Sequence, residues 1–196
     1  MDALLVLLLI GAVAVAVVFY RRYTAEQAKS RPAAGPPRDP LASESVRSDP
    51  RRITIGDVLR FEGRDFIIRG SITFDQDGFQ WQEHLLDDVE VKRWLSVEDD
   101  EGLEIAFWTA VKGAHLQPGP ETIEYGGKTY ELDEKGSARF TAVGTTGTGP
   151  NGRVEYYDYE AGAELLAFER YGEGDWEVAT GRTLGEFELD IYPGSD

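Results

Sequence analysis

Alternating apolar and polar residues predict β-strands along most of the chain after residue 53. In the segment 79–83, for example, Phe79, Trp81 and Glu83 fall on one face of a strand, and glutamines occupy the other. The Asp77-Gly78 pair before this segment is typical of a tight hairpin, because both residues tolerate positive φ. We therefore predict an all-β fold, mainly antiparallel, arranged as a meander, a sandwich or a barrel-like sheet.

The predicted strands follow one another at short intervals, with Gly, Asp or Asn in the turns between them. Only residues 83–89 suggest a short helical turn. The predicted strands are 58–62, 65–69, 71–74, 79–83, 91–97, 103–109, 122–125, 129–132, 138–143, 154–159, 164–168, 176–179 and 186–192.

The two halves of this region share a pattern. Residues 61–66 (FEGRDF) resemble residues 125–130 (YGGKTY), with an aromatic residue, a Gly, a basic residue and a second aromatic residue at matching positions. Two similar β modules, 53–116 and 121–192, would explain the match. Unrelated hairpins that reuse the same turn and aromatic residues would explain it equally well, and both interpretations stay open.

The first 23 residues predict a transmembrane anchor. Residues 3–20 carry no charge, and as a helix they would extend roughly 27 Å, close to the thickness of a bilayer's hydrocarbon core. Arg21 and Arg22 follow at once, so the positive-inside rule places the rest of the chain in the cytoplasm. A cleaved signal peptide is the alternative, but its basic n-region is missing. We expect a single-pass protein of the cell membrane, held in the lipid bilayer by this helix.

Charge divides the remainder of the chain. Residues 24–52 predict a flexible linker rich in Pro, Ala and Arg, whose alternative role is attraction to anionic lipid headgroups. Residues 53–196 predict one acidic β-domain, with 12 basic and 31 acidic residues. This acidity argues against binding nucleic acid, whose phosphates need a basic surface. The absence of cysteine excludes disulfides and thiolate metal sites.

The densest group of acidic residues is a candidate binding site. Glu98, Asp99, Asp100 and Glu101 are consecutive, and unpaired carboxylates raise the local concentration of cations. They predict a docking site for a cation, a polyamine or a basic protein surface. The alternative is a solvated turn between strands.

A second candidate ligand or partner site surrounds the histidine at position 84. It comprises Trp81, Glu83, His84, Asp87 and Asp88, and on a helical turn His84 and Asp88 would share a face. That spacing suits a metal or a proton-transfer pair, but one His with carboxylates is a poor zinc set. A hydrogen-bonded structural His is the alternative. We assign no metal, no cofactor and no catalytic residue.

Four segments resemble a known bacterial family. They are residues 55–58 (IGDV), 61–66 (FEGRDF), 81–88 (WQEHLLDD) and 93–98 (RWLSVE). Together they resemble the DUF4178 family, a domain of unknown function, so the resemblance implies no established activity or catalytic residues. It does imply an association with polyamine aminopropyltransferases and small membrane proteins, beside whose genes actinobacterial members tend to be encoded.

These observations favour a membrane-tethered acidic β-domain that acts as a binding or scaffold module for membrane or cytoplasmic partners. The first alternative is a sensor or binder of small cations, either a polyamine or a divalent metal. The second is a hydrolase-like enzyme that uses His84 and nearby carboxylates. The missing catalytic constellation favours a protein that is not an enzyme.

Overall fold

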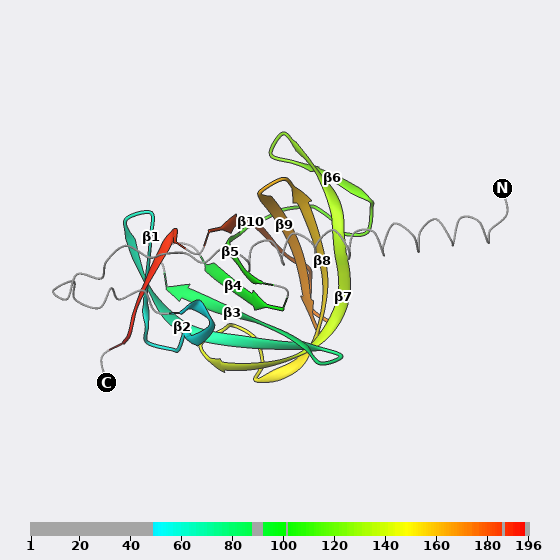
Figure 1. Cartoon of the computed structure of the whole chain (residues 1–196). Coiled ribbons are helices and arrows are strands. Elements are labelled where there is room, and N and C mark those ends of the chain that lie inside the picture. Colours follow the sequence, from blue (N-terminus) through cyan, green and yellow to red (C-terminus); the bar gives the residue numbers. More distant parts are fainter. Residues whose placement is uncertain (1–48, 88–91, 101, 186, 195–196) are drawn as a thin grey trace, which may run out of the picture. The chain divides into compact units, whose positions relative to one another are not determined.

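The computed structural model describes residues 49–87, 92–100, 102–185 and 187–194, all within one structural unit, Ser45–Asp196. These residues form an all-β fold, which confirms the predicted class (Figure 1). A single turn of 3-10 helix, η1 (Pro50–Arg52), precedes the strands. The strands are β1 (Val58–Phe61), β2 (Arg64–Gln76), β3 (Phe79–Asp87), β4 (Arg93–Asp99), β5 (Leu103–Ala110), β6 (Thr122–Tyr125), β7 (Lys128–Gly144), β8 (Asn151–Ala161), β9 (Glu164–Tyr171), β10 (Glu177–Leu184) and β11 (Leu189–Tyr192).

Eight of these strands close into an antiparallel barrel. The sheet order is β11-β1-β2-β3-β4-β5-β10-β9-β8-β7-β6, and β2 also pairs with β7, so the sheet returns on itself. The length of β2 allows this closure, because its first residues pair with β1 and its later residues pair with both β3 and β7. Strands β1, β11 and β6 extend beyond the closed ring.

Contacts between strands that are not neighbours identify the inner face of the barrel. Trp81 of β3 packs edge-on against Tyr156 of β8, with ring centroids 5.8 Å apart. The Tyr156 hydroxyl also lies 2.7 Å from Oε1 of Gln76 on β2. Since side chains alternate between faces, these contacts assign alternate residues of each strand to the interior.

The outer face of the barrel buries two separate apolar clusters. One lies beneath β1 and β11, where Phe61 packs on Phe107 of β5 with ring centroids 4.6 Å apart. The other joins Ile123 of β6 to Phe168 of β9 and Val178 of β10. The extension strands cover these two clusters. A third apolar cluster, which includes Phe74, Phe140 and Val154, lies on the inner face beside Trp81.

Glycines on the inner face make room for aromatic rings of neighbouring strands. A Cβ atom on Gly181 would lie 2.4 Å from the Trp108 ring, and one on Gly136 would lie 2.7 Å from the Tyr156 hydroxyl. The rings lie across the strands at these positions, as in sheets where an aromatic residue covers a glycine. The absence of a side chain at Gly181 and Gly136 thus provides the space that the Trp108 and Tyr156 rings occupy.

Several predicted elements have different bounds in the structure. The segments 65–69 and 71–74 are one strand, β2, and the segments 129–132 and 138–143 are one strand, β7. Exposed charged residues interrupt the alternation in β7, and a register shift between Leu132 and Glu134 accommodates them. The predicted helical turn at 83–89 is wrong as far as Asp87, because β3 continues to that residue. Duplication of the two halves stays a prediction.

The predicted fold class also included an N-terminal transmembrane helix, and this part is corrected. Residues 3–20, Arg21 and Arg22 lie outside the described residues. Within the part of the chain that the structure describes, no helix is long and apolar enough to span a membrane. An apolar run shows a preference for apolar surroundings, and that preference alone does not establish a spanning helix. The predicted cytoplasmic location stays a prediction.

Candidate functional site

Acidic residues of five strands share the inner face of the barrel; four of them are partly buried, and Glu134 is exposed. Strand register places Glu83 opposite Ser96, Asp158 opposite Glu134, and Glu169 opposite Tyr156, all on the face that the Trp81–Tyr156 contact defines as interior. Glu98 lies opposite Trp81 and shares that face. We call this set the inner acid cluster; it comprises Glu83, Glu98, Glu134, Asp158 and Glu169.

Two members of the cluster meet across the barrel. The side chains of Glu83 and Glu169 are hydrogen-bonded, which requires one of the two carboxyl groups to carry a proton. The Tyr171 hydroxyl donates to Oε2 of Glu169 at 2.9 Å. Burial raises the pKa of Glu169 to about 7. Burial and then the charges of Glu169 and Asp158 raise the pKa of Glu83 well above its usual value.

Asp158 is a carboxylate without a partner. Its side chain is partly exposed, and no hydrogen bond or ion pair joins it to another described residue. Burial and then the charges of Glu169 and Glu134 raise its pKa well above the usual value. Glu98 is less enclosed, and burial followed by the charge of Glu104 raises its pKa to about 7.

Aromatic rings stand beside these carboxyl groups. Trp81 stacks on Phe74 with ring centroids 4.9 Å apart and meets the edge of Tyr156. The Tyr156 hydroxyl lies 2.7 Å from Oε1 of Glu134 as well as from Gln76, so its single proton can be donated to either one. Aromatic faces beside carboxylates form an environment that attracts organic cations.

Positive charge is missing from the same environment. The strongest influences on the pKa values of Glu83, Glu98 and Asp158 are burial and other acidic groups. Among the described residues of β3, β4, β8 and β9, those that share the inner face include no Arg or Lys. No basic side chain on these four strands compensates the carboxylates, whereas protonation or a bound cation would do so.

The structure separates the predicted site residues. Trp81, Glu83 and Glu98 lie on the inner face, and exposed Asp100 follows β4. Asp87 ends β3, with Oδ2 3.6 Å from Nε of Arg69. Asp88 and Glu101 lie outside the described residues.

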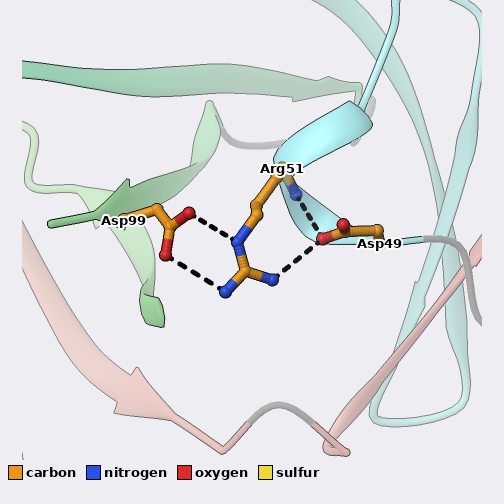
Figure 2. Close-up of polar contacts among 3 residues, drawn as sticks. All are labelled: Asp49, Arg51 and Asp99. Carbon is orange, nitrogen blue, oxygen red and sulfur yellow. Dashed lines mark hydrogen bonds and ion pairs between the residues drawn. The ribbon is translucent and has the colours of Figure 1, made fainter. Parts of the chain in front are cut away.

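Asp99 belongs to an ion pair that holds η1 against β4 (Figure 2). Nε and Nη2 of Arg51 donate to its two carboxylate oxygens at 2.7 and 3.1 Å, and Nη1 donates to Asp49 at 3.2 Å. Arg51 thereby holds the pKa of Asp99 below its usual value. Asp99 is thus already paired, in contrast to the free carboxylate expected for the predicted docking site.

His84 lies on the opposite face of β3 from the inner acid cluster. It is buried, its Nδ1 atom lies 2.8 Å from Oγ of Ser71, and burial lowers its pKa to about 4. Its hydrogen-bond partner is therefore a hydroxyl rather than a carboxylate. Among the described residues, no group of three or more His, Asp or Glu side chains is arranged to hold a metal ion.

Sequence reasoning missed the residues that complete the cluster: Glu134, Asp158 and Glu169, with Tyr156 and Tyr171. Alternation does place Glu169 on the opposite face from Leu166 and Phe168, but such a pattern ordinarily indicates a solvent-facing side of a strand. Only the pairing of β2 with β7 turns that face inward.

Comparison with known proteins agrees with the resemblance seen in the sequence. Residues 54–186 match the model of DUF4178, described as a domain of unknown function. Uncharacterised proteins of Mycobacterium bovis and Mycobacterium tuberculosis are each 37% identical over 197 residues, covering 96% of this chain and 93% of their own length. An uncharacterised protein of Aquifex aeolicus is 23% identical over 160 residues, covering 75% of this chain and 86% of its own. No solved structure matches the chain. The chain belongs to the DUF4178 family.

Proposed function

We propose that this β-domain is a binding module for a small cation, which it holds inside the barrel. The observation that carries the proposal is the inner acid cluster, whose carboxyl groups come from five strands and have no Arg or Lys beside them on the inner face of the described strands β3, β4, β8 and β9. A cation was the first alternative that the sequence offered. The interior would provide a location for it that the exposed Asp99 and Asp100 do not.

Electrostatics supports this role. Transferring a carboxylate from water into a protein interior is unfavourable unless an opposite charge or hydrogen bonds compensate it. The raised pKa values of Glu83, Asp158 and Glu169 mean that protons can provide the compensation. A bound cation replaces those protons, and Trp81 and Tyr156 add a cation–π contribution of about 0.5–2 kcal/mol.

The other predicted functions have less support. A hydrolase would need His84 accessible to substrate and hydrogen-bonded to a carboxylate. It is buried, its hydrogen-bond partner is the Ser71 hydroxyl, and Asp57 influences it only through its charge. The scaffold role rests mainly on the predicted membrane anchor and linker, and residues 1–48 lie outside the described residues. The scaffold role stays a prediction, and the proposal is limited to cation binding.

Thermal unfolding of the full-length protein at fixed ionic strength tests the proposal. Two samples of equal ionic strength are compared, one containing a linear triamine and the other NaCl. The wild-type protein should have the higher Tm in the triamine, because a ligand that binds the folded state stabilises it. The double variant Glu83→Gln/Glu169→Gln should lose this increase.

The matched control is Glu121→Gln/Glu124→Gln, which removes two exposed acids of equal charge. It should keep the increase. Equal Tm values in triamine and NaCl, or an undiminished increase in the Glu83/Glu169 variant, would show only ionic screening and would refute the proposal.

A further inference from the structure

We propose that the outer face of the barrel carries a separate site, which binds a small hydroxylated molecule through one phosphate or carboxylate group. The site is an open groove across β2, β3, β7 and β8, with a volume of about 500 Å³, which is typical of small-molecule sites. The residues that line it are Thr73, Asp75, Gln80, Arg139, Phe140, Thr141, Asn151, Gly152 and Arg153. The inference does not depend on cation binding inside the barrel.

One row of the groove, running across the strands, contains two guanidinium groups. Arg139 of β7 lies directly opposite Asp75 on β2 and directly opposite Arg153 on β8. Like charges directly opposite each other destabilise a sheet, and the Arg139 side chain is still 74% exposed after it pairs with Asp75. A bound oxyanion would compensate the two arginines, which gives a physical reason for their placing side by side in an acidic domain.

Neighbouring side chains orient both arginines and leave donors available. Nη2 of Arg139 donates to Oδ1 of Asp75 at 3.2 Å, and Nε2 of Gln80 donates to Oδ2 of the same carboxylate at 3.0 Å. Nη2 of Arg153 donates to the Ser137 hydroxyl at 3.2 Å. Because a guanidinium has several N–H groups, both arginines keep donors that no other described side chain occupies. Arginine donors suit the paired oxygens of a phosphate or a carboxylate.

The adjacent row supplies neutral hydrogen-bonding groups. Thr141 of β7 lies between Thr73 of β2 and Asn151 of β8. No hydrogen bond joins these three side chains to another described residue. Hydroxyl and amide groups both donate and accept, so this row can bind the hydroxyl groups of a ligand whose anionic group contacts the arginines. The two rows together therefore favour a phosphorylated or carboxylated hydroxy compound over an apolar anion.

Amide NMR of the full-length protein tests the inference, with glycerol, glycerol 3-phosphate, glycerate and inorganic phosphate as probes at equal ionic strength. Glycerol 3-phosphate or glycerate should shift the amide resonances of residues 139–141 and 151–153 until they saturate, and glycerol should not. Arg153→Gln should weaken this binding by about tenfold, because it removes a charged donor. The matched control is Arg52→Gln, which removes an exposed arginine outside the groove and should leave the affinity unchanged.

The probes also identify the anionic group and test the neutral row. Whichever of glycerol 3-phosphate and glycerate binds more tightly assigns the groove to phosphorylated or to carboxylated ligands, and either result supports the inference. Glycerol 3-phosphate should bind more tightly than inorganic phosphate, and Asn151→Ala should reduce that difference. Equal affinities for these two phosphates, undiminished binding to Arg153→Gln, shifts that NaCl reproduces, or no saturable shift with any probe would overturn the inference. None of these results bears on cation binding in the interior.

Discussion

At the scale of single residues, environment rather than residue type distinguishes the acids of this protein. Asp65 pairs with Arg60 at the surface, and this contact holds the pKa of Asp65 below its usual value. Glu169 is enclosed, and the pKa of its carboxyl group is raised to about 7. The first acid is stabilised when ionised and the second when protonated, so the two respond oppositely to pH.

The raised pKa of Glu169 predicts how stability varies with pH. Between its ordinary value of 4.5 and about 7, the folded state binds more protons than the unfolded state, so the free energy of unfolding falls as pH rises. Glu83 and Asp158 act in the same direction. Between pH 6.5 and 8 the Tm of the ligand-free protein should fall by about 2–4 °C, the change expected for ~1 kcal/mol in a domain of this size.

His84 determines the pH range of that measurement. Its pKa is lowered from 6.5 to about 4, so it makes stability increase with pH below 6.5 and contributes little above. The control is Glu83→Gln/Glu169→Gln, whose Tm should vary less between pH 6.5 and 8. A wild-type Tm that rises over this range would contradict the assigned protonation of the inner acid cluster.

At the scale of elements, the sequence predicted most strands but not how they join. Alternation and Asp77-Gly78 located the β2–β3 hairpin, since local pattern and turn chemistry determine such a unit. The pairing of β2 with β7 joins Phe74 to Phe140, residues far apart in the chain, and alternation carries no information about such partners. The candidate site was therefore predicted in part: Trp81, Glu83 and Glu98 were named, and the acids contributed by β8 and β9 were not.

Closure of the barrel depends on a close approach at Gly70. A Cβ atom there would lie 2.3 Å from the carbonyl oxygen of Thr145, whose amide donates to Arg69 O at 2.9 Å across the β2–β7 seam. Gly70→Ala should therefore lower the free energy of unfolding by about 1–3 kcal/mol, measured by urea denaturation. Gly102→Ala is the matched control, because nothing lies within 4 Å of its Cβ position, and its effect should stay within about 0.5 kcal/mol. Equal effects of the two substitutions would argue against a tightly closed seam.

At the scale of the whole molecule, closure of the sheet determines which of the acids behind the net charge of −16 face the barrel interior and which face solvent. Acidity of a domain surface ordinarily serves solubility and weak attraction of counterions. Here the outer face of the barrel packs against the extension strands, and part of the acidity lies on the inner face. Net charge and alternation were visible in the sequence, but the inward orientation of these acids follows only from the long-range closure.

The most direct test of cation binding inside the barrel is carboxyl carbon NMR of the full-length protein during titration with a linear triamine. The carboxyl resonances of Glu83, Asp158 and Glu169 should shift toward their ionised positions as the amine replaces protons. The resonance of Asp99, already paired with Arg51, should change little. Shifts confined to exposed acids such as Asp100, with the interior resonances unmoved at saturation, would contradict the account.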